Sequence, residues 1–177
     1  EESAKSKISY GKQGLQFDDE TGNNFLWFGV RLQTRGEFNR VSNDEIAGAP
    51  TSESTDIELK RGRLKLGGHL VSPAFMVYSE YDIVDSRLLD LRATYKFADW
   101  LSIRIGQWKS EFNRERFDSS GKQQFVERSI VTYWFTVDRQ NGVMASGRLA
   151  AGQPADASWW LGVLNGNGLN SSGDGGK

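Results

Sequence analysis

Residues 26–38 read LWFGVRLQTRGEF and alternate between two kinds of side chain along their whole length. Apolar or small residues share one parity (Leu26, Phe28, Val30, Leu32, Thr34, Gly36, Phe38), and mostly polar residues share the other (Trp27, Gly29, Arg31, Gln33, Arg35, Glu37). A period of two is typical of a β-strand, whose successive side chains point to opposite faces. The run exceeds the ~5–6 residues of most globular strands, whereas a membrane-crossing strand needs ~9–11. The stretch therefore predicts a strand of a transmembrane barrel, with one face toward lipid and the other toward a wet lumen.

The same alternation recurs along the rest of the chain. Strands are predicted at residues 14–17, 61–70, 75–83, 89–97, 101–109, 141–151 and 157–165. The 89–97 strand is expected to place Leu89, Leu91, Ala93, Tyr95 and Phe97 on its lipid side. Ile57 and Leu59 have the wrong parity for the 61–70 strand, and a β-bulge at residues 60–62 would correct it. Residues 39–55 are predicted to form a loop, and no long segment has a helical period, so the chain is predicted to be all-β.

The predicted connections fall into two classes. With the 26–38 strand counted first, short joints follow the second, fourth and sixth strands, at residues 72–74, 98–100 and 152–157. Long joints follow the first, fifth and seventh, and the tight joint at residues 85–86 is the exception on that side. Antiparallel strands alternate in direction, so the short joints share one end, as in outer-membrane barrels. Aromatic residues cluster at the same end, as expected of an interfacial belt; they are Phe25, Trp27, Phe28, Phe75, Tyr95, Phe97, Trp100, Trp159 and Trp160.

Composition excludes several other classes of protein. The net charge of -1 argues against a nucleic-acid partner, and the absence of cysteine excludes a disulfide scaffold, a cysteine nucleophile and a thiolate metal site. His69 is the only histidine, which favours a wall residue over a catalyst or ligand. We therefore expect no enzyme activity, metal or cofactor. No charged-then-apolar leader opens the chain, so it is predicted to be a mature protein without its signal peptide.

Six landmarks occur in order along the chain. They are GLQF at 14–17, FGVRLQ at 28–33, RGRLKLGG at 61–68, RIGQWKSEF at 104–112, FVERS at 125–129 and LNGNG at 164–168. In this order and spacing they resemble the phosphate-selective porin family, the porin O and P group. The resemblance implies a bacterial outer-membrane porin with a barrel of sixteen antiparallel strands, a homotrimer surrounded by outer-membrane lipid, which passes small solutes passively. Residues 1–177 would be a single domain supplying the first seven or eight strands, with the remainder of the barrel expected in further sequence.

The resemblance also implies a role for residues 109–139, the long segment after the 101–109 strand. In such porins a loop at this position folds into the lumen and narrows it, and a short helix is expected here at residues 123–130. The charged residues expected to line the constriction are Lys109, Glu111, Arg114, Glu115, Arg116, Asp118, Lys122, Glu127 and Arg128. Mixed charges across an opening produce a transverse field. Composition alone leaves open a solvated surface loop.

The polar parity of the strands carries more basic than acidic residues. The basic residues predicted to line the pore are Arg31, Arg35, Arg61, Arg63, Lys65, Arg92, Lys96, Arg104 and Arg148, against the acidic Glu37, Glu80, Asp82 and Asp90. Charges lining a pore set which ion enters, so this excess favours small anionic solutes, and a planar guanidinium matches phosphate oxygens. The alternative is that a wet lumen tolerates charges that pair across strands.

Two other functions fit an all-β chain. A soluble β-rich binding module, such as a sandwich or a small barrel, would turn the apolar parity toward a core. Gly36, Gly68 and Ala93 on that parity are small for such a core, and the charged parity suits water. A barrel that serves as a structural sheath around a partner protein is the other alternative.

Overall fold

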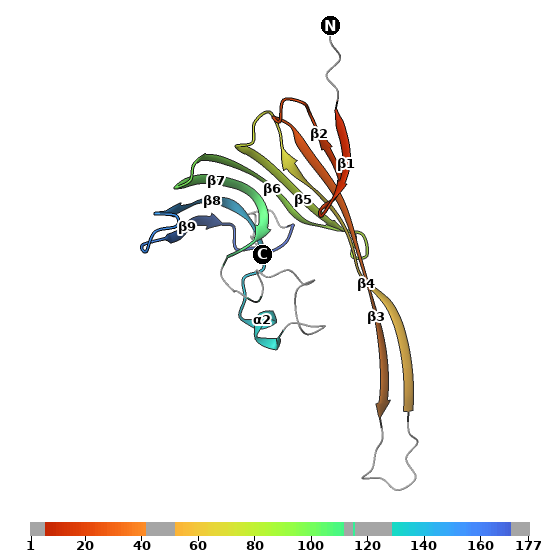
Figure 1. Ribbon diagram of the computed structural model, residues 1–177. Helices are drawn as coiled ribbons and strands as arrows, with labels where there is room; N and C mark the ends of the chain where they lie inside the picture. Colours follow the sequence, from red (N-terminus) through yellow and green to blue (C-terminus); the bar gives the residue numbers. More distant parts are fainter. Residues whose placement is uncertain (1–5, 42–51, 112–114, 116–128, 171–177) are drawn as a thin grey trace.

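The computed structural model describes residues 6–41, 52–111, 115 and 129–170. They form one antiparallel sheet of nine strands whose spatial order equals the chain order, so every neighbouring pair is joined directly along the sequence. The strands are β1 (Lys7–Gly11), β2 (Gly14–Asp18), β3 (Phe25–Val41), β4 (Ser52–His69), β5 (Phe75–Asp82), β6 (Arg87–Ala98), β7 (Leu101–Lys109), β8 (Arg139–Leu149) and β9 (Ala157–Leu164). The sheet is strongly curved and not closed on itself (Figure 1). The all-β prediction is confirmed, and β1 is a strand that the sequence did not predict.

Strands β3 and β4 form the longest pair of the sheet. Their register runs from Phe25 opposite His69 to Val41 opposite Ser52, with one shift at which Gln33 pairs with Arg61 and Thr34 pairs with Leu59. Lys60 is therefore the extra residue of a bulge, which confirms the predicted correction of phase. The pairing continues to Val41 and Ser52, so the predicted loop at 39–55 is shorter than expected, and this hairpin extends beyond the rest of the sheet (Figure 1).

The two faces of the sheet differ as the alternation predicts. Val30, Leu32, Leu91, Ile105 and Val143 are exposed on the outer, convex side, as lipid-facing residues should be. The prediction is wrong for one residue that was expected on this face. Leu89 is only 2% exposed, because the register of β5 and β6 shifts after Glu80 and leaves Leu89 as an inserted residue beside Asp90. A bulge reverses the direction of the side chains that follow it, which alternation alone does not reveal.

The helix α2 (Ile130–Trp134) lies between β7 and β8 in the chain. It lies on the same side as the free end of the β3–β4 hairpin (Figure 1). It starts at the last residue of the helix predicted at 123–130, of which 123–128 lie outside the described residues. Within the described part of the chain, no helix has the length and apolar character needed to cross a membrane.

Candidate functional site

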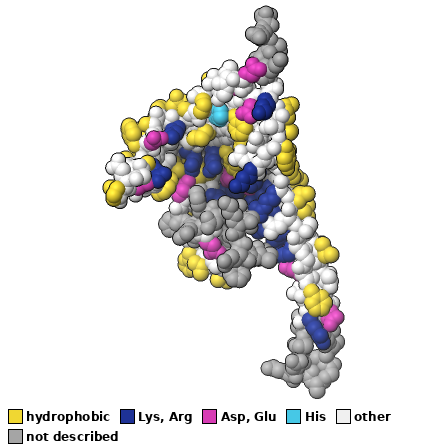
Figure 2. Space-filling view, viewed as in Figure 1, with side chains coloured by type: hydrophobic (Ala, Val, Ile, Leu, Met, Phe, Trp, Pro, Cys, Tyr) yellow, Lys and Arg dark blue, Asp and Glu magenta, His cyan; other side chains and the backbone are white. Residues whose placement is uncertain are grey.

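Basic side chains gather in the hollow of the curved sheet. Figure 2 shows Lys and Arg concentrated there, whereas hydrophobic side chains dominate the outer margins of the wall. The register explains this grouping, since it places successive polar-parity residues of neighbouring strands side by side. Arg31 pairs with Arg63, and Arg63 pairs in turn with Asp82, so one row of the concave face reads across three strands. The concave face is therefore the candidate site.

A glutamine holds two of the arginines on the β3–β4 side of this face. The Nη2 of Arg31 donates to Oε1 of Gln33 at 2.9 Å, and the Nη1 of Arg61 donates to the same oxygen at 3.1 Å. The amide is neutral, so it orients both guanidinium groups without cancelling their charge. Two cations thus remain close together and favour an anion over a cation nearby.

Glu80 is the acidic centre of the neighbouring part of the face. Its Oε1 accepts a hydrogen bond of 2.7 Å from Nη1 of Arg63, and its Oε2 accepts one of 2.7 Å from the hydroxyl of Tyr78. Lys65 lies 3.9 Å from the same carboxylate, and Asp82 lies 3.6 Å from Nε of Arg63. The side chains of Glu80 and Asp82 are 7% and 3% exposed, so these carboxylates are turned into the wall and covered by their cations.

Aromatic rings support two further arginines. The guanidinium carbon of Arg92 lies 4.8 Å from the centre of the Tyr78 ring, and that of Arg104 lies 5.6 Å from the centre of the Trp108 ring. Glu111 accepts hydrogen bonds from Arg104 at 2.6 Å and from the Trp108 indole at 3.1 Å. A ring face attracts a cation without removing its charge. Both arginines are therefore fixed in place while they remain cationic.

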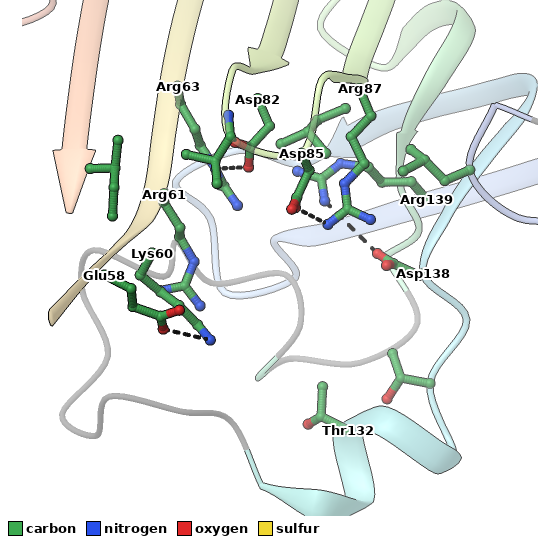
Figure 3. A pocket seen from close by; sticks show the side chains of 15 residues that line it. Glu58, Lys60, Arg61, Arg63, Asp82, Asp85, Arg87, Thr132, Asp138 and Arg139 are labelled. Carbon is green, nitrogen blue, oxygen red and sulfur yellow. Dashed lines mark hydrogen bonds and ion pairs between the residues drawn. The ribbon is translucent and has the colours of Figure 1, made fainter. Parts of the chain in front are cut away.

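A polar cavity of about 510 Å³ lies where this face meets residues 129–139. Figure 3 shows Arg61 and Arg63 on one side of the cavity, with Arg139 and Asp138 on another and Thr132 of α2 below. Arg139 is 3% exposed, and its Nε donates to Asp90 Oδ1 at 2.8 Å. This buried ion pair ties the first residue of β8 to β6, at the point where residues 129–138 join the sheet. The cavity is thus bounded by both the sheet and that segment.

The other predicted pore-lining residues lie toward the two ends of the wall. Arg35 is on the long extension of the β3–β4 hairpin and pairs with Glu37 at 2.9 Å and Glu58 at 2.8 Å. Lys96 pairs with Asp99 at 2.6 Å in the turn between β6 and β7. Arg148 donates to Asp156 at 2.7 Å in the turn between β8 and β9. These three residues are separated from the central group, and their pore-lining role stays a prediction.

The Arg148–Asp156 contact leads to a prediction about acid titration. The hydrogen bond from Arg148, aided by one from the Gly152 amide, lowers the pKa of Asp156 from 3.8 to about 2. The contact is therefore present above the ordinary pKa and is lost as the pH falls through about 2. We expect Arg148→Leu to return the pKa of Asp156 toward 3.8 in a ¹³C NMR titration of its carboxyl carbon. Asp19, whose pKa is lowered to about 2 chiefly by Asn24, is the internal reference that should not move.

Three of the predicted constriction residues lie in the described part of the chain. Lys109 is the last residue of β7, Glu111 binds Arg104 and Trp108, and Glu115 accepts hydrogen bonds from Ser129 and Thr132 at the start of α2. Glu115 thus fixes the helix rather than pointing at solvent. The other members, Arg114, Arg116, Asp118, Lys122, Glu127 and Arg128, lie outside the described residues, and their role stays a prediction.

Sequence reasoning missed the groups that orient the arginines. Gln33, Tyr78 and Trp108 contact Arg31, Arg92 and Arg104, but only their parity on the strands pointed to the concave face. Arg139 lay at the limit of the predicted constriction segment and was not proposed as a lining residue. His69 contacts the Gly22 carbonyl at 3.1 Å through Nε2, as a wall residue does. Among the described residues, no group of three or more His, Cys, Asp or Glu is placed to hold a metal ion.

An antiparallel wall with an apolar convex face and a basic concave face is the arrangement expected of part of a transmembrane β-barrel with a wet lumen. The comparison with protein families agrees, since the model for "Phosphate-selective porin O and P" matches residues 28–177. The chain therefore belongs to the phosphate-selective porin O and P family and is an outer-membrane porin, part of a family of channels rather than of enzymes. Among curated proteins, none matches this chain.

Proposed function

We propose that this porin passes small hydrophilic solutes passively and prefers anions, with phosphate as the favoured class. The observation that carries this proposal is the unequal satisfaction of the two signs of charge. The side chains of Glu80, Asp82 and Asp90 are 7%, 3% and 9% exposed, and each lies next to an arginine. These three carboxylates are therefore already engaged by protein cations.

Three arginines, in contrast, have guanidinium nitrogen atoms without a hydrogen-bond acceptor among the described residues. Arg63 Nε, Arg104 Nε and Arg139 Nη2 are buried nitrogen atoms that make no hydrogen bond within the described part of the chain. These nitrogen atoms are enclosed by protein, so a passing anion is expected to meet the guanidinium groups of Arg61 and Arg63 where they line the polar cavity, and charge-assisted hydrogen bonds to its oxygens would hold it there. Arg63 and Arg139 both line the polar cavity. A phosphate has several oxygens and matches the planar fork of arginine better than a monatomic anion does.

Bilayer recordings of the purified porin test this function. With a KCl gradient across a planar membrane, we expect a reversal potential of the sign given by chloride permeation. Inorganic phosphate added at low concentration is expected to reduce the chloride current, because it occupies the arginine-lined hollow for longer than chloride does. A reversal potential of the opposite sign would refute the anion preference. An anion-selective current that phosphate leaves unchanged would refute the phosphate preference alone.

The sheath alternative is tested by the same recordings. A barrel filled by a partner protein would give no open channel after purification in detergent, and a partner would be recovered with it. The charged, cavity-bearing concave face favours a water-filled passage, since charged side chains need water or counter-charges around them.

A further inference from the structure

Gln107 is buried, although its position in β7 predicts a side chain exposed on the convex face. It continues the parity of Ile103 and Ile105, and Ile105 is 57% exposed on the convex face, yet Gln107 is only 4% exposed. Its side chain is turned toward the bulge of β6 instead. The amide Nε2 donates to the backbone carbonyls of Leu88 at 3.1 Å and Leu89 at 2.9 Å. A polar amide is thus hidden from lipid by filling the irregularity of the neighbouring strand.

The same amide binds a segment far along the chain. Gln107 Nε2 also donates to Oδ1 of Asn170 at 3.0 Å, and Gln107 Oε1 accepts a hydrogen bond of 2.8 Å from the Asn170 backbone N–H. An amide both donates and accepts, so this two-way contact cannot be made by a carboxylate or an apolar side chain. Gln107 therefore joins the β6 bulge to the residues that follow β9.

Residues 165–170, called here the return segment, cross the loop-side ends of three strands. The Asn165 N–H donates to the carbonyl of Asn141 in β8 at 2.9 Å, and the Gly168 N–H donates to Oε1 of Gln140 at 3.0 Å. Asn170 then reaches Gln107 in β7, and through it β6. Between the last two anchors, Leu169 lines the polar cavity together with Arg61 and Arg63. The path of the return segment therefore leads it to the basic hollow.

We propose that the return segment is a second border of the passage, beside residues 129–139, and that Gln107 is the positioning residue that holds it there. Gln107 touches no solute. It acts through Asn170 by fixing how far Leu169 stands from the arginines on the opposite side of the cavity. The proposal goes beyond anion preference, because it concerns the width of the passage and not the sign of its charge.

The absence of cysteine makes a direct test possible. In Leu169→Cys, the single thiol of residues 1–177 would lie on the cavity, and reaction with sulfonatoethyl methanethiosulfonate adds a short charged group there. We expect a stepwise loss of single-channel conductance on reaction. Val143→Cys, which carries the thiol on the convex face, should show no such loss. Failure of Leu169→Cys to react in the folded porin, or reaction without loss of conductance, would overturn the proposal.

The role of Gln107 is tested on the Leu169→Cys background. Gln107→Leu removes all four hydrogen bonds, and Asn170→Gly removes the side-chain acceptor at a residue whose φ of 56° suits glycine. We expect both to change the rate of thiol labelling several-fold, followed by mass, and to diminish the conductance loss. Gln153→Leu, in an exposed turn at the other end of the wall, is the matched control. Labelling and blocking equal to the control would show that Gln107 does not position the segment. Labelling is measured without a current, so an absence of anion preference leaves this result interpretable.

Discussion

Replacing Arg63 by leucine is expected to shift the porin toward cations and to destabilise its fold. Arg63 is the guanidinium that covers both Glu80, at 2.7 Å, and Asp82, at 3.6 Å. Its removal takes one cation from the hollow and leaves two carboxylates, less than 8% exposed, short of their main partner. Breaking a buried ion pair in this way costs about 3–5 kcal/mol. The local potential becomes less positive, so the ratio of anion to cation permeability should fall several-fold in a KCl gradient.

Companion variants separate the electrostatic effect from the loss of stability. Arg63→Leu combined with Glu80→Gln removes one charge of each sign, so it should recover much of the thermal stability. Its selectivity should lie between that of Arg63→Leu and the original protein. Arg40→Leu is the matched control, because Arg40 also belongs to the β3–β4 pair but is exposed on the extension of the hairpin, away from the cavity, and pairs with the exposed Glu53. If Arg63→Leu kept both its permeability ratio and its heat-unfolding midpoint on gels, the concave face would not be the selectivity site.

The sequence predicted the strands in which successive residues face lipid and water in turn. The alternation from Leu26 to Phe38 followed from lipid on one side and water on the other, and the register of β3 with β4 confirms it, including the bulge at Lys60. That bulge could be predicted because the apolar residues before Lys60 are out of phase with the apolar residues after it. The bulge at Leu89 was not predicted. Leu88, Leu89 and Leu91 are all apolar, so the alternation of apolar and polar residues shows no shift there.

The alternation predicts which face of the sheet a residue lies on, but not its position along the barrel axis. Arg35, Lys96 and Arg148 were predicted on the same pore-side face as Arg63, but each is engaged by a carboxylate away from the central group. The position along the axis depends on where the turns fall and on how far each strand is staggered from the next. A strand pattern read from one segment contains neither quantity. The central arginines therefore became distinct from the terminal ones only in the folded sheet.

Contacts between distant segments were the least predictable feature of the site. Arg139 and Asp90 are 49 residues apart, and Gln107 and Asn170 are 63 apart. Residues 164–170 are rich in Gly and Asn and show no period that indicates a direction. Their path is set by amide hydrogen bonds to β7 and β8, which are specific in space but have no counterpart in a local pattern.

Replacing Gly68 by alanine is expected to prevent correct assembly of the wall. Gly68 has φ of 153° and faces Leu26 across the β3–β4 pair. A Cβ at this position would overlap the carbonyl oxygen of Phe25 and lie 2.9 Å from the Cα of Leu26. Both neighbours are backbone atoms, so neither can turn aside as a side chain would. The strain of a non-glycine residue in such a conformation, about 1–3 kcal/mol, adds to the clash.

Gly36→Ala is the matched control for this prediction, because it lies in the same strand pair and on the same face. A Cβ at Gly36 would have no atom within 4 Å, so alanine there should be neutral or stabilising by about 0.4–1 kcal/mol. The folded fraction after refolding into detergent, read from the heat-dependent gel shift, should fall sharply for Gly68→Ala and stay unchanged for Gly36→Ala. Equal folded fractions and equal conductance for the two variants would contradict the close approach of β3 to β4. Since the Arg31–Arg63 row depends on that pairing, such a result would also remove the structural basis of the basic hollow.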